Sequence, residues 1–273
     1  MLKMTKFDEA RLRNFYILHQ WRILNVDNLK KFGIFPEKKS SLRRRISKLE
    51  DKKLLASFCD PETRKKYIYL TKRGENALKI KNYPPSLTKR CLRHDAKSVE
   101  IALKFFDMDN LFDIVPEHKI VDRRQFKVGK CGVADFELLF KNDKGEGLKM
   151  AGELEISRKS KQKISAKLRH YLETCIHDKV VYFVPHKGVL TLIKGLLKKE
   201  LQGKSAEKFI FAHHPQMLSN DELALEEFNW SYLERKTNFK ECMNYFTKKG
   251  PKKEVHIEVP RRYQGNVTGA LTI

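Results

Sequence analysis

The sequence has no long apolar run. No stretch approaches the roughly 18 apolar residues of a membrane-spanning helix, and Met1 is not followed by the apolar segment of a signal peptide. It also has no GxxxxGK(S/T) or GxGxxG phosphate-binding loop. We therefore expect a cytoplasmic protein with no membrane partner and no nucleotide cofactor.

Cysteine is sparse and unpatterned. The chain has five cysteines, an odd number, with no CxxC pair and no histidine at zinc-ligand spacing from a cysteine. They are Cys59, Cys91, Cys131, Cys175 and Cys242. We expect them to be reduced and expect no structural zinc.

Acidic residues are too few to balance the basic ones. The 273 residues include 57 Lys and Arg but 34 Asp and Glu, giving a net charge of +23 and a pI near 9.8. Residues 1–80 alone hold 21 Lys and Arg against 9 Asp and Glu. A protein without a polyanionic partner gains nothing from such self-repulsion, whereas phosphate neutralisation drives binding to nucleic acid. Nucleic acid is therefore the leading candidate partner.

The hydrophobic pattern of residues 1–81 predicts a small helical domain with a hairpin. It indicates helices at about 8–24, 26–32 and 38–53, strands at 54–59 and 65–70, and a helix from 72 to about 80. Asn25 and Thr71 are the expected N-caps of the second and last helices. In the third helix Leu42, Ile46 and Leu49 form the stripe that needs a core. This order is that of a winged helix-turn-helix.

The run Tyr69-Leu70-Thr71-Lys72-Arg73-Gly74 resembles the end of the wing in bacterial winged-helix regulators. The third helix would then be the recognition helix, which enters the major groove of double-stranded DNA. The expected DNA-binding residues are Ser40, Arg43, Arg44, Ser47 and Lys48 on that helix, and Arg64, Lys65 and Lys66 on the wing. The alternative is a solvated basic helix beside a plain surface hairpin. Some winged helices bind protein or RNA instead.

Residues 82–87, with paired prolines, are expected to be a linker. Residues 88–215 are expected to form an α/β domain with a mixed sheet, and residues 216–273 a partly helical extension with a loose basic tail. The predicted strands are 112–121, 134–140, 149–157, 179–185 and 208–212; the predicted helices are 88–106, 159–175, 190–201 and one around Trp230.

Three carboxylates in this second domain are candidate metal ligands and catalytic groups. Asp135 lies early in one predicted strand, and Glu153 and Glu155 share one face of the next. If the strands are neighbours, the three acids converge into an oxygen cluster of the kind that holds Mg²⁺ or Mn²⁺. The alternative is that both glutamates are exposed on an edge strand and paired with Lys149 or Arg158.

The order of helix, strands, Asp135, Glu153, basic helix and strand resembles the PD-(D/E)XK nuclease-like fold. That family expects lysine where this chain has Glu155, and some of its members carry the lysine on the following helix, where Lys159, Lys163 and Lys167 are available. Many members are inactive. The whole arrangement, with His94-Asp95, Gly152-Glu153-Leu154-Glu155-Ile156-Ser157, Leu168 and Tyr171, resembles the replication-relaxation family of plasmids and mobile elements.

These resemblances imply a double-stranded DNA-binding protein associated with plasmid or nucleoid DNA, acting in origin binding, mobilisation or transcriptional control. It would need no cofactor to bind DNA, and a homodimer is the other expected partnership. The alternative is a metal-dependent endonuclease or nickase using Asp135, Glu153 and Glu155, with Lys159 or Lys163 steadying water or phosphate and Mg²⁺ or Mn²⁺ bound. A third hypothesis is a basic protein-interaction module that binds DNA without regard to sequence.

Overall fold

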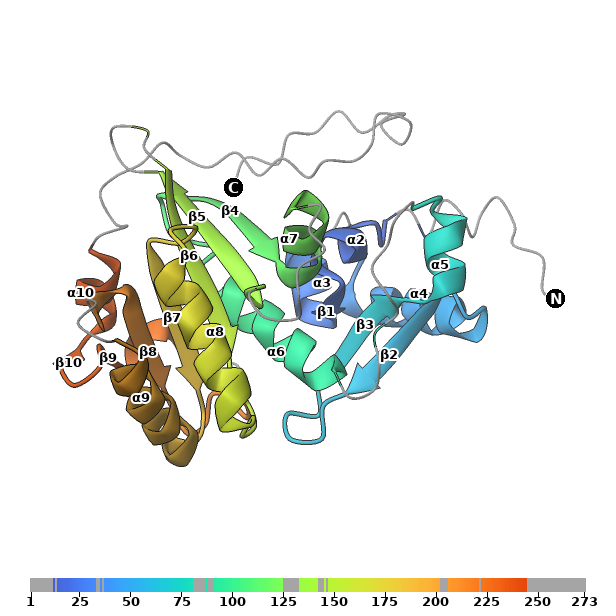
Figure 1. Ribbon diagram of the computed structural model, residues 1–273. Coiled ribbons are helices and arrows are strands. Elements are labelled where there is room, and N and C mark those ends of the chain that lie inside the picture. Colours follow the sequence, from blue (N-terminus) through green and yellow to red (C-terminus); the bar gives the residue numbers. More distant parts are fainter. Residues whose placement is uncertain are drawn as a thin grey trace. The chain divides into compact units, whose positions relative to one another are not determined.

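The computed structural model (Figure 1) describes residues 12, 14–32, 35, 37–80, 87, 91–124, 133–141, 145, 147–201, 206–220 and 222–244. The protein is a mixed α and β chain with one three-stranded and one seven-stranded sheet. It divides into two compact units, with the boundary between Val99 and Glu100. The expected linker, apart from Leu87, and the tail beyond Asn244 lie outside the described residues.

The first unit is built on a small antiparallel sheet with strand order β1-β3-β2. Its elements are α2 (Ile17–Trp21), β1 (Ile23–Asn25), α3 (Val26–Phe32), α4 (Lys39–Asp51), β2 (Leu55–Cys59), β3 (Lys66–Leu70) and α5 (Lys72–Ala77). The predicted inner stripe of α4, made by Leu42, Ile46 and Leu49, is buried. The Asn25 side chain accepts a hydrogen bond from the backbone N–H of Asn28 at 2.8 Å, which confirms the predicted N-cap.

The predicted helix at 8–24 is only partly present among the described residues, because 14–16 form a turn, α2 covers Ile17–Trp21, and the prediction is wrong at its C-terminal end. Arg22 adopts a left-handed backbone with φ of 63°, which ends α2. Ile23 and Leu24 then pair with Tyr69 and Ile68 of β3, and both are buried. A three-residue strand whose partner lies more than forty residues away leaves no local pattern in the sequence. The helical periodicity therefore extended the predicted helix into residues that belong to β1.

The connection between β3 and α5 is organised around the backbone carbonyl of Leu54. The Thr71 backbone N–H donates to this oxygen at 3.2 Å. The Thr71 hydroxyl accepts from the Gly74 N–H at 3.1 Å, which caps α5 as predicted. A Cβ atom added to Gly74 would lie 2.1 Å from the Leu54 oxygen, so only glycine fits at this position.

The second unit contains a seven-stranded sheet with strand order β10-β9-β8-β7-β6-β5-β4. The strands β6, β7 and β8 are parallel, and the remaining neighbours are antiparallel. The elements are α6 (Leu92–Leu103), which contains the boundary between the units, β4 (Leu111–Pro116), α7 (Glu117–Arg124), β5 (Phe136–Lys141), β6 (Gly147–Leu154), α8 (Lys161–Glu173), β7 (Lys179–Val184), α9 (Lys187–Leu201), β8 (Phe209–His213), β9 (Asn229–Ser231), β10 (Lys236–Thr237) and α10 (Phe239–Met243).

Two further predictions of secondary structure are corrected. The expected strand at 112–121 stops at Pro116, and helix α7 follows it. The expected helix around Trp230 is strand β9, in which Trp230 pairs with Ala212 of β8. The Trp230 indole N–H donates to the carbonyl of Leu225 at 2.7 Å. Both segments are therefore set by contacts with residues outside their own local pattern.

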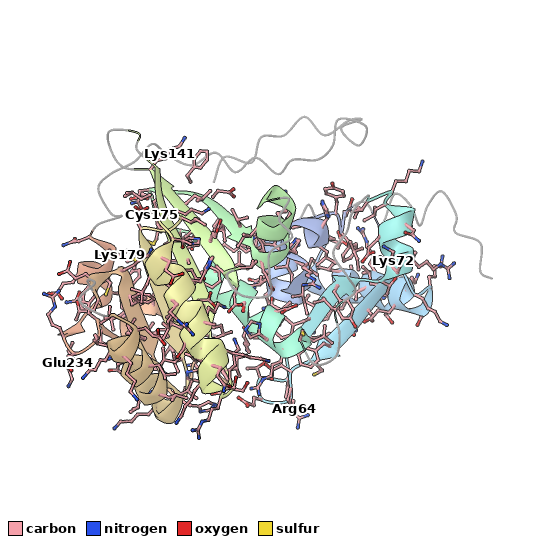
Figure 2. All side chains as sticks on the ribbon, viewed as in Figure 1. Arg64, Lys72, Lys141, Cys175, Lys179 and Glu234 are labelled. Atoms are coloured by element: carbon pink, nitrogen blue, oxygen red, sulfur yellow. The ribbon has the colours of Figure 1, made fainter. Side chains whose placement is uncertain are left out.

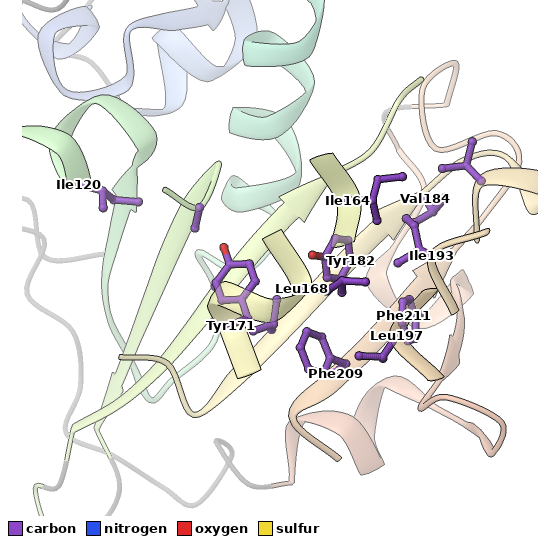
Figure 3. Close-up of a cluster of buried hydrophobic side chains, with 14 of the residues drawn as sticks. Ile120, Ile164, Leu168, Tyr171, Tyr182, Val184, Ile193, Leu197, Phe209 and Phe211 are labelled. Atoms are coloured by element: carbon purple, nitrogen blue, oxygen red, sulfur yellow. The ribbon is translucent and has the colours of Figure 1, made fainter. Parts of the chain in front are cut away.

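Helices α8 and α9 pack against one face of the large sheet (Figure 3). The apolar core there includes Ile164 and Leu168 of α8, Ile193 and Leu197 of α9, and Phe209 of β8. Tyr171 of α8 and Tyr182 of β7 lie in the same layer, with their hydroxyl groups inside the protein (Figure 3).

Cys59, Cys91 and Cys175 are exposed free thiols and Cys242 is a buried one; Cys131 lies outside the described residues. Burial raises the pKa of Cys242 to about 11. Among the described residues, no helix is long and apolar enough to cross a membrane.

Candidate functional sites: a basic face and a buried carboxylate cluster

The outer face of α4 carries the residues predicted to contact DNA. With the apolar stripe turned inward, all five predicted residues of α4 are exposed, namely Ser40, Arg43, Arg44, Ser47 and Lys48. Lys39, Ser41 and Asp51 of the same helix are exposed as well. Arg45, at the edge of the stripe, is partly buried and pairs with Glu37 at 3.0 Å. The five predicted residues thus contribute two arginines, a lysine and two serines to the exposed face of the helix.

The loop between β2 and β3 carries the other predicted group. Arg64 is exposed near its tip with a left-handed φ of 57°, and Figure 2 shows its side chain projecting outward from this loop. Lys66, at the start of β3, forms an ion pair with Glu50 of α4 at 2.6 Å. This pair connects the hairpin to the last turn of α4.

A pocket of about 400 Å³ lies where α3, α4 and this loop come together. Four of the predicted residues, Arg43, Arg64, Lys65 and Lys66, line it. The rest of the lining is Asn25, Val26, Asp27 and Ile46, so four cations face one carboxylate. The structure therefore brings the predicted helix and loop residues together in one electropositive hollow, with Ser40, Arg44, Ser47 and Lys48 outside its lining.

A buried ion pair holds the base of the loop. Asp60, directly after β2, lies 3.4 Å from the ammonium group of Lys97 on α6, and both side chains are about 1% exposed. Lys97 also donates to the Tyr67 hydroxyl at 3.3 Å. Sequence reasoning did not single out Lys97, because a lysine in an amphipathic helix normally indicates a solvated face.

In the second unit, Asp135 and Glu153 come together as predicted. Asp135 directly precedes β5, and the pairing of Phe136 with Gly152 places it opposite Glu153 of β6. Tyr182 of β7 pairs with Glu153 on the other side. All three side chains are therefore neighbours on the sheet face that α8 covers.

Glu153 is completely buried and has protein partners on both carboxylate oxygens. Lys167 of α8 donates to Oε2, and the Tyr171 hydroxyl donates to Oε1. Asp135 Oδ2 accepts the backbone N–H of Leu154 at 2.7 Å. The acids at the centre of the cluster are thus engaged by a lysine, a tyrosine and the main chain.

Glu155 follows β6 and lies at the margin of the same cluster. Its backbone N–H donates to the backbone carbonyl of Phe183 at 3.0 Å, and its Oε1 accepts a hydrogen bond from the Lys159 ammonium at 2.8 Å. Its Oε2 is buried without a hydrogen-bond partner, as is the hydroxyl of Tyr182. The alternative of exposed glutamates on an edge strand is wrong, because β6 is an internal strand and both glutamates are buried.

The three candidate lysines of the following segment occupy different positions. Lys159 pairs with Glu155, and Lys163 is exposed in the first turn of α8, where its backbone N–H donates to the Ser160 cap at 3.4 Å. Lys167, about one turn beyond Lys163, is the lysine that reaches Glu153. The prediction favoured Lys159 or Lys163 as the functional lysine and named Lys167 only as available, whereas Lys167 is the one that pairs with Glu153.

The electrostatics of the cluster follow from burial and charge. Burial, and secondarily the charge of Asp135, raise the pKa of Glu153 to about 7, against the opposing effects of Lys167 and Tyr171. Burial disfavours the Lys167 ammonium, but the carboxylates of Glu153, Asp135 and Glu155 outweigh it and raise the pKa of Lys167. Lys167 therefore remains a cation throughout the neutral range.

The residues as arranged do not fit a divalent cation. Mg²⁺ and Mn²⁺ need several oxygen ligands directed at one point. Here Lys167 and Tyr171 take both oxygens of Glu153, and Lys159 takes one of Glu155. Within the described part of the chain, no group of three or more His, Cys, Asp and Glu side chains is placed to hold a metal ion.

A second buried acid lies nearby on the same sheet. Glu137 of β5 accepts from His177 at 2.8 Å and pairs with Lys149 of β6 at 2.8 Å. Burial opposes its ionisation, but the two hydrogen bonds and charges outweigh burial and lower the pKa of Glu137. Sequence reasoning missed this group, since its three members come from separate segments with no common spacing.

No protein-family model matches the chain, and neither the curated proteins nor the solved structures contain a significant match. What the chain does is therefore inferred from its own residues.

Proposed function

We propose that the chain is a double-stranded DNA-binding protein that uses residues 1–80 as a winged helix-turn-helix. The observation that carries the proposal is the pocket where Arg43 of α4 meets Arg64, Lys65 and Lys66 of the β2–β3 loop. Four cations gathered around a hollow of about 400 Å³ suit a phosphodiester backbone better than a neutral ligand.

The order of elements supports the same proposal. Strand β1 between α2 and α3, then α4, then the hairpin β2–β3, is the order expected for a winged helix-turn-helix. In that arrangement the exposed face of α4 enters the major groove. Arg44, Ser40 and Ser47 would approach base edges, because arginine bonds guanine bidentately and serine bonds either bases or phosphates. Arg43, Lys48 and the loop cations would bind the flanking phosphates.

The second unit supports a narrower proposal about biological role. The order α6, β4, β5, β6, α8, β7 is the one that the PD-(D/E)XK resemblance leads us to expect, with helix α7 as an addition between β4 and β5 and with Asp135 and Glu153 side by side. We take the protein to act on plasmid or mobile-element DNA, in origin binding, mobilisation or transcriptional control. The second unit would add backbone contacts, a partner surface or a homodimer contact.

The test begins with selection of a preferred duplex from a random pool, followed by fluorescence anisotropy at fixed salt. Arg44→Ala is expected to weaken binding to the selected duplex by about 1–3 kcal/mol and to affect random duplex much less. The control is Lys199→Ala, which removes one exposed charge from α9 in the other unit. If Arg44→Ala binds the selected duplex and the random duplex each as tightly as the wild type does, α4 does not read the DNA sequence. A preference for RNA, or no preference for any duplex, would contradict the proposal itself.

The alternative, a metal-dependent endonuclease or nickase, is the weaker proposal because protein groups already engage the Glu153 oxygens. Cleavage of supercoiled plasmid with Mg²⁺ or Mn²⁺, comparing the wild type with Glu153→Ala, separates the two. Nicking by the wild type alone would favour the enzyme. Intact plasmid together with tight duplex binding favours the DNA-binding protein.

A further inference from the structure

The carboxylate cluster of Asp135, Glu153 and Glu155 contains a cation that the protein itself supplies, the ammonium group of Lys167. The Lys167 ammonium donates to Glu153, and it also interacts electrostatically with Asp135 and Glu155. Its side chain is 16% exposed, while that of Glu153 is 0% exposed. One ammonium group on α8 thus interacts favourably with the charges of all three acids.

The cluster also contains buried polar atoms that its own side chains leave unpaired. Glu155 Oε2 and the Tyr182 hydroxyl have no hydrogen-bond partner, although these residues are only 3% and 1% exposed. Tyr182 is the register neighbour of Glu153, and the charges of Glu153, Glu155 and Asp135 all act on it. A buried oxygen without a partner is costly, so these atoms mark the cluster as able to accept a further polar group.

Removal of the ammonium would change the chemistry of the cluster. Glu153 Oε2 would lose its donor, while Glu155 would keep its pairing with Lys159. A buried uncompensated charge is strongly unfavourable, and oxygen ligands are those that Mg²⁺ and Mn²⁺ prefer. The space left by the ammonium group would be bordered by Glu153 Oε2, and the negative charges of Asp135 and Glu155 would favour a cation there.

We propose that Lys167 is the resident cation of this cluster, its ammonium group standing in the place of a divalent metal ion, so that the wild-type centre is closed to metal and loss of Lys167 opens it. Tyr171, which donates to the other oxygen of Glu153, holds that carboxylate in position. The inference goes beyond the proposed DNA-binding function and does not depend on it.

The test is a titration of the full chain with Mn²⁺ in the absence of DNA. Electron paramagnetic resonance measures the Mn²⁺ that stays free, and the bound amount is the difference. Lys167→Met keeps most of the side-chain length but removes the charge, and it is expected to bind one Mn²⁺ per chain at least ten-fold more tightly than the wild type. The matched control is Lys163→Met on the same helix, an exposed lysine whose loss is expected to leave binding at the wild-type level. Adding Glu153→Gln to Lys167→Met is expected to abolish the gained binding.

Two results would overturn the proposal. One is stoichiometric Mn²⁺ binding by the wild type that Glu153→Gln removes, since the centre would then be open already. The other is a folded Lys167→Met variant that binds no more Mn²⁺ than the wild type does. If Lys167→Met does not fold without metal, circular dichroism is used to follow its refolding with and without Mn²⁺. Recovery of secondary structure only with Mn²⁺ would support the proposal that the metal ion can replace the lysine ammonium. No recovery with Mn²⁺ would contradict it.

Discussion

At the scale of single residues, the most consequential side chain is the buried Glu153. Its environment combines complete burial, a second carboxylate at Asp135, and donors from Lys167 and Tyr171. Burial is the largest of these effects and favours the protonated acid. We therefore expect Glu153 to take up or release its proton near pH 7.

This produces a defined pH dependence of stability. The pKa of Glu153 is raised to about 7 in the folded chain, so its contribution to stability is complete below the unfolded pKa and falls as pH rises through about 7. Relative to Glu153→Gln, which cannot titrate, the wild type is expected to lose about 1–3 kcal/mol of unfolding free energy between pH 5 and pH 8. Urea unfolding of both proteins across this range measures the difference. A difference that grows in favour of the wild type with rising pH would contradict the assignment.

Residues in regular apolar patterns were predictable, and residues in buried ion pairs were not. Leu42, Ile46 and Leu49 followed from helical spacing, and the pairing of Asp135 with Glu153 followed from consecutive strands. Lys97 and Lys167 are basic residues of helices, and sequence alone normally places such residues in solvent. Their acidic partners are supplied by distant strands, so only the folded chain identifies them.

At the scale of elements, length decided much of what the sequence could predict, although the eight-residue helix α7 was missed. Helices α3, α4, α8 and α9 and the strands β2, β3 and β5 to β8 were anticipated closely, because each carries enough residues to show a period. Strands β1, β9 and β10 have two or three residues each and were missed. Their conformation is fixed by hydrogen bonds to a neighbouring strand, and no local pattern reports those bonds.

The start of α5 gives a test at this scale. Gly74→Ala would place a methyl group against the Leu54 carbonyl, 2.1 Å away, and this backbone oxygen cannot rotate aside. We expect a loss of about 1–3 kcal/mol in unfolding free energy. The control is Gly195→Ala in the exposed middle of α9, where an added Cβ meets nothing within 4 Å.

Gly195→Ala is expected to stabilise the protein by about 0.5–1 kcal/mol, because alanine favours a helix interior over glycine. Thermal unfolding of both variants measures the contrast. If Gly74→Ala is as stable as the wild type, the close approach of α5 to Leu54 is not present in solution.

At the scale of the whole molecule, the net charge of +23 is the dominant property. Like charges in a compact chain repel, and salt screens that repulsion over a Debye length of about 8–10 Å near physiological ionic strength. Without DNA, raising NaCl from about 0.05 M to 0.5 M is expected to raise the melting temperature by about 2–4 °C, which corresponds to roughly 1 kcal/mol. Calorimetry at both salt concentrations measures it. A melting temperature that falls with salt would mean that exposed ion pairs such as Lys198–Glu234 outweigh the repulsion.

The two outer strands of the large sheet have a consequence for behaviour at high concentration. Strand β10 has only two residues, and β4 has a register irregularity between Leu111 and Asp113 and ends in Pro116, which has no N–H to offer. Beside this irregularity, Lys141 covers the ring of Phe112 at 3.7 Å from its centre. Short, bent and charged borders are poor templates for another chain. Among the described residues, both margins of the sheet therefore disfavour edge-to-edge polymerisation, and we expect the protein to stay free of fibres when it is concentrated.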